Sequence, residues 1–275
     1  MTDRPAFQFT SADVSLAYDH LLVPRLFEPW AELLLDLAAP RRGEWLLDVA
    51  TGPGTVARAA AARLGAEGRV VGTDVSPQML GLARAKPAPP DAAAIEYIES
   101  PAAPLAVPDG AFDRVTCQQG LQFFPDRAAA LLEMRRALRP GGVLAVAVWA
   151  AIEQCPIYAA LHAALRATVP AALADELLAP WSLGDAAALG ASVRDAGFRA
   201  PEIDTRSLPL VFELGVDQAA GALAATPLHP RLSSLPLERR AALTEAVRAR
   251  LSALRDGDGA VRAPMTCHIA LARRG

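Results

Sequence analysis

Residues 46–57 read Leu-Leu-Asp-Val-Ala-Thr-Gly-Pro-Gly-Thr-Val-Ala, and they decide the fold of this chain. A short apolar strand that carries Asp48 leads into a turn with Gly52 and Gly54, and an alanine-rich helix follows. Glycines let the backbone of such a turn approach a ligand without a Cβ in the way. A second apolar strand ends in Asp74, where a carboxylate can accept hydrogen bonds from both hydroxyls of a ribose. The stretch therefore predicts a nucleoside site in an α/β fold.

The main alternative ligand is a dinucleotide. The turn satisfies G-x-G-x-x-G/A, and Asp74 lies 20 residues beyond Gly54, as that fingerprint requires. Asp48 argues against it, because a carboxylate near the helix N-terminus would repel a pyrophosphate. The same charge suits an ammonium or sulfonium group. We therefore favour S-adenosylmethionine, a nucleoside with a cationic tail and no phosphate, over NAD.

Composition narrows the class of protein further. A chain of 275 residues with 52% hydrophobic residues, many of them alanine, fits one helix-rich α/β domain with a cap. The net charge of −3 without a basic block argues against nucleic acid as a partner. No apolar run reaches the ~18 residues needed to span a bilayer, and the N-terminus lacks a signal-peptide core. Three separated cysteines without a CxxC pattern fit reduced thiols, a cytoplasmic location and no metal site.

The order of expected elements indicates βαβ units and a mostly parallel sheet. Strands are expected at residues 46–49, 69–73, 95–98, 112–117 and 143–149, and helices at 31–38, 55–64 and from Ser76 onward. Two late strands, 201–212 and 265–272, lack a βα fingerprint and suggest an antiparallel edge.

The remaining helical segments, at about 151–190 and 215–256, have no strand to cross over to, so we expect them to form a cap on the pocket. Within a single domain we expect three regions. They are an N-terminal helical lid (1–45), a cofactor-binding core (46–150), and a cap that includes the last two core strands (151–275).

These parts resemble class I S-adenosylmethionine-dependent methyltransferases, especially the branch related to ubiquinone and menaquinone biosynthesis and to bacterial small-molecule methyltransferases. The likeness covers residues 18–149 and rests on four motifs, at residues 47–54, 71–76, 108–113 and 138–142. It implies a Rossmann-like, seven-stranded, mostly parallel sheet with one antiparallel strand and helical cap insertions. It also implies an enzyme that transfers a methyl group to a small-molecule acceptor.

The resemblance further implies which residues hold the cofactor. Asp48 and the turn after it would hold the amino-acid tail, Asp74 the ribose, and Gln118 the methionyl portion, with Tyr18 closing over the carboxylate. Val75 and Met79 would flank the adenine. The full set is Tyr18, Asp48, Ala50, Thr51, Gly52, Gly54, Asp74, Val75, Met79, Pro101, Ala102 and Gln118.

Two positions depart from the family pattern. Ser100-Pro101-Ala102 stands where relatives commonly have Gly-Asp-Ala, so adenine selectivity must come from backbone groups or from Glu99. Ala50 stands where many relatives have glycine, and we expect the turn to keep a negative φ there.

Methyl transfer mainly requires alignment of the reacting atoms and exclusion of water, and a general base helps only where the methyl acceptor must lose a proton. The candidate bases are His20 and His229, whereas His162 is expected on a solvated helix face and His268 in a structural role. Gln122, Phe123 and Trp181 are expected to line a pocket for an apolar or aromatic methyl acceptor. The alternatives are a protein that binds S-adenosylmethionine for a non-methylating reaction such as a cyclisation, and an NAD-linked oxidoreductase.

Overall fold

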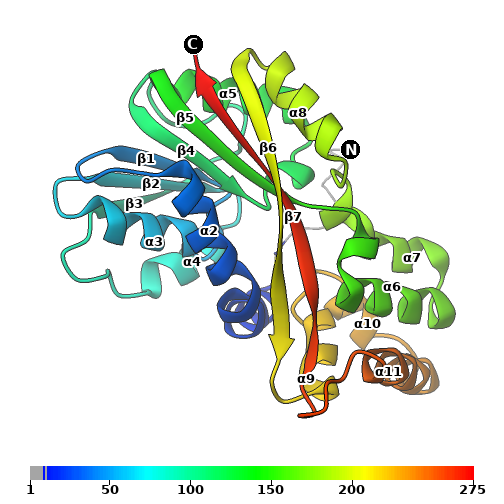
Figure 1. Ribbon diagram of the computed structural model, residues 1–275. Helices are drawn as coiled ribbons and strands as arrows, with labels where there is room; N and C mark the ends of the chain where they lie inside the picture. The colour runs from blue at the N-terminus through cyan, green and yellow to red at the C-terminus, as the bar shows by residue number, and fades with distance from the viewer. Residues whose placement is uncertain (1–8, 10) are drawn as a thin grey trace.

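The computed structural model describes residue 9 and residues 11–275, and a seven-stranded sheet forms its centre (Figure 1). The strand order is β3-β2-β1-β4-β5-β7-β6. The first five strands are parallel, and β7 runs antiparallel to both of its neighbours, β5 and β6. The strands are β1 (Trp45–Val49), β2 (Arg69–Asp74), β3 (Ala94–Glu99), β4 (Phe112–Gln118), β5 (Leu138–Trp149), β6 (Phe198–Phe212) and β7 (Val261–Arg274). The expected fold class, including the reversed strand, is confirmed.

Two helical layers cover the faces of the sheet. On one face, α2 and α3 and the cap helices α6 and α11 share one apolar core; on the other, α5 and α8 pack on the strands. The helices are α1 (Ala12–Ala17), α2 (Glu28–Ala38), α3 (Thr55–Leu64), α4 (Pro77–Ala85), α5 (Arg127–Ala137), α6 (Pro156–Thr168), α7 (Ala171–Asp175), α8 (Ala186–Asp195), α9 (Val216–Ala220), α10 (His229–Ser233) and α11 (Leu237–Ser252). In the described part of the chain, no helix has the length and apolarity needed to cross a membrane.

The N-terminal segment is more helical than the sequence predicts. Only residues 31–38 show clear periodicity, yet α1 continues through η1 (Tyr18–Phe27), a helix with π-type hydrogen bonding, into α2. Pro24 lies inside η1. A proline removes one helical hydrogen bond and crowds the preceding turn, which explains why the local sequence gives a weak helical signal. Wide π-type turns are frequent at functional sites.

The strands β6 and β7 extend well beyond the rest of the sheet. Pairing of β5 with β7 stops where Trp149 meets Cys267, whereas β6 and β7 stay paired as far as Phe212 and Val261. The two strands therefore leave the sheet as a ribbon, with α9 and α11 beside its far end (Figure 1). Both strands are longer than expected: β6 begins at Phe198 and not at residue 201, and β7 spans residues 261–274 and not 265–272. Pro209 is tolerated in β6 because β6 is an edge strand.

Helix α8 lies on the sheet and not in the cap. It packs against β6 and buries Leu189 and Val193 in the core shared with α5. The cap on the pocket is formed by the segments before α8 and after β6.

Candidate functional site

A cavity of about 470 Å³ opens at the carboxyl ends of β1, β2 and β4. Val49 is the last residue of β1 and Ala50 follows it; Asp74 is the last residue of β2, and Gln118 the last of β4. This is the edge at which open α/β sheets bind ligands. The other walls come from η1, the loop around Pro101, η2 (Leu121–Phe123) and the cap element η4 (Glu176–Trp181). The cavity therefore lies between the core, the N-terminal segment and the cap.

The lining is aromatic and carries few charges. Eight of the fifteen aromatic side chains of the protein (eight Phe, four Trp and three Tyr) line this cavity. They are Phe9, Tyr18, Phe27, Phe123, Phe124, Trp149, Tyr158 and Trp181. Asp74 and Asp126 are the charged residues of the lining, and within the described chain it includes no lysine, arginine or histidine. The cavity thus suits cationic or neutral aromatic groups better than phosphates.

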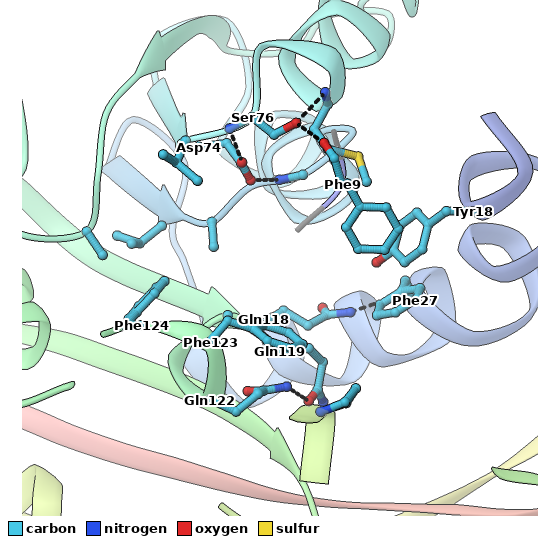
Figure 2. Close-up of a pocket in the computed structure, with 18 of the residues that line it drawn as sticks. Phe9, Tyr18, Phe27, Asp74, Ser76, Gln118, Gln119, Gln122, Phe123 and Phe124 are labelled. Carbon is cyan, nitrogen blue, oxygen red and sulfur yellow. Dashed lines mark hydrogen bonds between the residues drawn. The ribbon is translucent and has the colours of Figure 1, made fainter. Parts of the chain in front are cut away.

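Asp74 connects the turn after β1 to the start of α4. Its carboxylate accepts hydrogen bonds from the backbone N–H groups of Gly52 and Ser76, both at 2.8 Å. Burial raises the pKa of Asp74, and the backbone donors oppose that rise. Figure 2 shows Asp74 and Ser76 on one side of the cavity, facing the glutamines of β4 and η2 on the other. The carboxylate retains lone pairs that can accept from a sugar.

The glycine turn contains a residue whose conformation contradicts our expectation. Ala50 has φ +57°, in the left-handed region, although we expected a negative value. The tertiary structure accommodates its methyl group because residue 120 is glycine: a Cβ at Gly120 would lie 2.6 Å from the Ala50 Cβ. Gly52, also at positive φ, has no atom within 4 Å of the place where a Cβ would be. The turn therefore leaves room for a ligand directly above Gly52.

Asp48 does not face the cavity, which corrects the electrostatic argument made from the sequence. It is 1% exposed and accepts hydrogen bonds from the hydroxyls of Thr51 at 2.7 Å and Thr116 at 2.8 Å. Desolvation raises its pKa to about 7, so the group is not a fixed negative charge at neutral pH. Thr51 and Gly54 also lie behind the lining, Gly54 against Tyr97. These residues shape the turn from beneath, and the carboxylate beside this turn that lines the cavity is that of Asp74.

The other residues expected at the cofactor line the cavity. They are Tyr18, Ala50, Gly52, Val75, Met79, Pro101, Ala102 and Gln118. Gln118 donates through Nε2 to the backbone oxygen of Phe27 at 2.9 Å, and its buried Oε1 has no hydrogen-bond partner. The Tyr18 ring packs between those of Phe9 and Phe27, edge-to-face with the first and tilted against the second, at centroid distances of 4.9 and 4.8 Å.

Neither candidate base lies in the cavity lining. His20 is exposed on the N-terminal segment, and His229 is half-buried outside the lining. His162 pairs with Asp175 at 3.0 Å, and His268 is buried and hydrogen-bonded within the sheet. Among the residues that the structure describes, the cavity lining thus contains no histidine.

The three residues expected in the methyl-acceptor pocket, Gln122, Phe123 and Trp181, all line the cavity. Tyr158 is a lining residue that the sequence did not indicate. It is 5% exposed, lines the cavity and lies with its ring centroid 4.9 Å from that of Trp181. Helical periodicity could not reveal the burial of Tyr158, because α6 contacts other elements, among them α11, α7 and β7, on more than one side.

Comparison with known proteins agrees with this geometry. The model of the ubiE/COQ5 methyltransferase family matches residues 12–179, more than half of the chain. A demethylmenaquinone methyltransferase from Thermus thermophilus is 42% identical over 118 residues, which are 42% of this chain and 52% of that protein. Its counterpart from Listeria monocytogenes is 36% identical over 135 residues, covering 48% and 57%. The chain therefore spans about half the length of the curated relatives it matches.

Solved structures share the fold at low identity. A SAM-dependent methyltransferase from Aquifex aeolicus has a TM-score of 0.56 at 16% identity, covering 98% of this chain and all of that one. Phosphoethanolamine N-methyltransferase 2 from Haemonchus contortus has a TM-score of 0.60 at 17% identity, covering 96% and 57%. The sheet, the cavity at its carboxyl edge and the family match lead to one conclusion: the chain belongs to the ubiE/COQ5 methyltransferase family.

Proposed function

We propose that this protein is an S-adenosylmethionine-dependent methyltransferase that acts on an O, N or C nucleophile of a small, apolar or aromatic molecule. One observation carries the proposal: the cavity at the nucleoside edge of the sheet is lined by aromatic rings and carboxylates, without a cationic side chain among its described residues. Such a lining accepts a sulfonium and an aromatic ring together.

The residues present fit the cofactor. Asp74 offers a carboxylate for the ribose hydroxyls, and the space above Gly52 admits the ligand without a clash. The unpartnered Oε1 of Gln118 is an acceptor for the α-ammonium of the amino-acid tail. When bound, S-adenosylmethionine supplies a methyl group already activated by a positively charged sulfur.

A dinucleotide fits less well. Binding a pyrophosphate requires free backbone N–H groups at the turn, or cationic side chains. In this turn Gly52 N–H donates to Asp74, Gly54 N–H donates to the Thr51 carbonyl at 3.0 Å, and Thr51 N–H donates to the Thr73 carbonyl at 2.9 Å. Because these three N–H groups are already used within the fold, the turn disfavours a pyrophosphate, and hence an NAD-linked oxidoreductase, whichever way Asp48 points.

The chain's own contribution to transfer is alignment and exclusion of water. Aromatic walls from η1 and the cap exclude water, which favours an in-line approach of nucleophile to methyl group. Because no histidine lines the cavity among the described residues, we propose that the methyl acceptor carries a nucleophile that ionises readily without a strong protein base. The name demethylmenaquinone methyltransferase refers to a quinone, and similarity to those relatives supports an aromatic or quinone-like methyl acceptor.

Calorimetry and turnover test this proposal together. The protein should bind S-adenosylmethionine and S-adenosylhomocysteine, with no comparable heat from NAD. A panel of phenols, quinols and aromatic amines should give S-adenosylhomocysteine and a methylated product in equal amounts. Binding without any methylated product across the panel would favour a non-methylating use of the cofactor, and NAD binding would contradict the proposal.

A further inference from the structure

Two neighbouring glutamines of the cavity lining, Gln119 and Gln122, form a chain of hydrogen bonds that leaves one side-chain oxygen without a donor. Gln119 donates through Nε2 to the Cys267 sulfur at 3.3 Å, and Gln122 donates through Nε2 to Gln119 Oε1 at 3.2 Å. The Oε1 of Gln122 is buried and has no hydrogen-bond partner. Figure 2 shows the amide nitrogen of Gln122 turned toward Gln119. We call Gln119 and Gln122 the glutamine pair.

Cys267 fixes the direction of this chain of hydrogen bonds. Burial raises the pKa of the Cys267 thiol, so the sulfur carries its single hydrogen at neutral pH. That hydrogen is donated to the backbone oxygen of His268 at 3.5 Å, which leaves the sulfur as an acceptor. Gln119 must then present its NH₂ group to the sulfur and its oxygen to Gln122. As a result, Gln122 uses its NH₂ group within the pair and is left with its oxygen.

The surrounding backbone holds the glutamine pair in place. Gln119 has φ +56°, a conformation that a non-glycine residue keeps only where its surroundings enforce it, and its N–H donates to the Ala147 carbonyl at 2.8 Å. The backbone oxygen of Gln122 accepts from Arg127 at 2.9 Å and from Ser182 of the cap at 3.3 Å. An unpartnered buried acceptor is unfavourable, so a donor brought by a ligand would be favourable.

Resting on the proposed function, we propose that Gln122 is a specificity-determining residue whose side-chain oxygen accepts a hydrogen bond from a hydroxyl or amino group on an otherwise apolar methyl acceptor. Gln119 and Cys267 are positioning residues that keep this oxygen available. Gln122 lies on η2, which contacts η4 of the cap, so the selected group sits where core and cap meet. A compound of the same shape without a donor leaves the oxygen unpaired and is rejected.

Matched ligands with and without a donor provide the test. Naphthol and its methyl ether, and tert-butylphenol and its methyl ether, are titrated calorimetrically into the protein, both alone and saturated with S-adenosylhomocysteine. We expect the wild type to bind each phenol about tenfold more tightly than its ether. Gln122→Met should reduce this ratio to about one while leaving the affinity for S-adenosylhomocysteine unchanged.

Two further variants keep the test decisive if Gln122→Met does not fold. Gln122→Asn keeps an amide but withdraws its oxygen by one methylene, and Cys267→Ala removes the partner of Gln119; both should lower the ratio to about two or three. A ratio that stays near ten in the variants, or lies near one in the wild type, would overturn the inference. Failure to bind S-adenosylhomocysteine would instead contradict the proposed function, while the titrations without it still report on Gln122.

Discussion

Replacing Asp74 with asparagine separates the two roles that the structure gives this residue. Asp74 anchors Gly52 and Ser76 through two backbone N–H bonds, and it faces the cavity. Asparagine offers one oxygen in place of two, so one part-buried N–H loses its acceptor. We expect the free energy of unfolding to fall by about 1–3 kcal/mol, the cost of one unsatisfied buried group.

The effect on cofactor binding should be larger. Two ribose hydroxyls that donate to an ionised carboxylate stabilise the complex by about 2–4 kcal/mol. Asp74→Asn should therefore weaken the binding of S-adenosylhomocysteine roughly 30- to 1,000-fold. Since burial raises the pKa of Asp74, the wild-type affinity should also decrease as the pH is lowered through that pKa, and the variant should lack this part of the pH dependence.

Isothermal titration calorimetry at pH 8 measures the affinity, and urea unfolding measures the stability. Asp126→Asn is the matched control, because Asp126 is the other carboxylate of the lining and asparagine can still cap α5, as Asp126 does by accepting from the Ala129 N–H at 2.9 Å. The control should keep wild-type affinity within about threefold. Equal affinities of both variants and the wild type would mean that the ribose is held elsewhere, and the assignment of Asp74 would be wrong.

Three further predictions concern the elements around the cavity. Gly120→Ala should lower the free energy of unfolding by about 1–3 kcal/mol, because its Cβ would overpack against Ala50. Adding Ala50→Gly should restore part of this loss. Additive effects of the two substitutions in urea unfolding would show that the positions are not in contact. Lys86, the only lysine of the chain, donates to the Asp19 carboxylate at 2.6 Å and to the Pro53 carbonyl of the glycine turn at 3.2 Å. Lys86→Met should therefore speed the dissociation of S-adenosylhomocysteine about fivefold in stopped-flow measurements. An unchanged rate would contradict a role of Lys86 in holding the N-terminal segment closed. Between the ordinary pKa of 3.8 and about 7, Asp48 stays protonated in the folded protein but ionises in the unfolded chain. The free energy of unfolding should therefore fall by up to roughly 4 kcal/mol as the pH rises through this range. Urea unfolding at pH 5 and 7.5 should show a smaller fall for Asp48→Asn.

Local sequence was enough to predict the alternation of strands and helices, the glycine turn and the acid at the end of β2. These features depend on neighbouring residues: apolar runs of strand length, glycines that permit positive φ, and Ser76, whose side chain caps α4 by accepting from the Met79 N–H. The seven-stranded sheet with one reversed strand followed from the same local signals and from the family resemblance.

Which of these groups lines the cavity depends on contacts between distant parts of the chain. Asp48 turns away because Thr116, 68 residues further along the chain, supplies a hydroxyl donor beneath the turn. Ala50 adopts a positive φ because a glycine at position 120 leaves space for its methyl group. The free oxygen of Gln122 is likewise fixed through Gln119 by a cysteine 148 residues from Gln119. Contacts between residues so far apart leave no periodic trace in the sequence, so side-chain direction and hydrogen-bond polarity at the site could be read only from the folded chain.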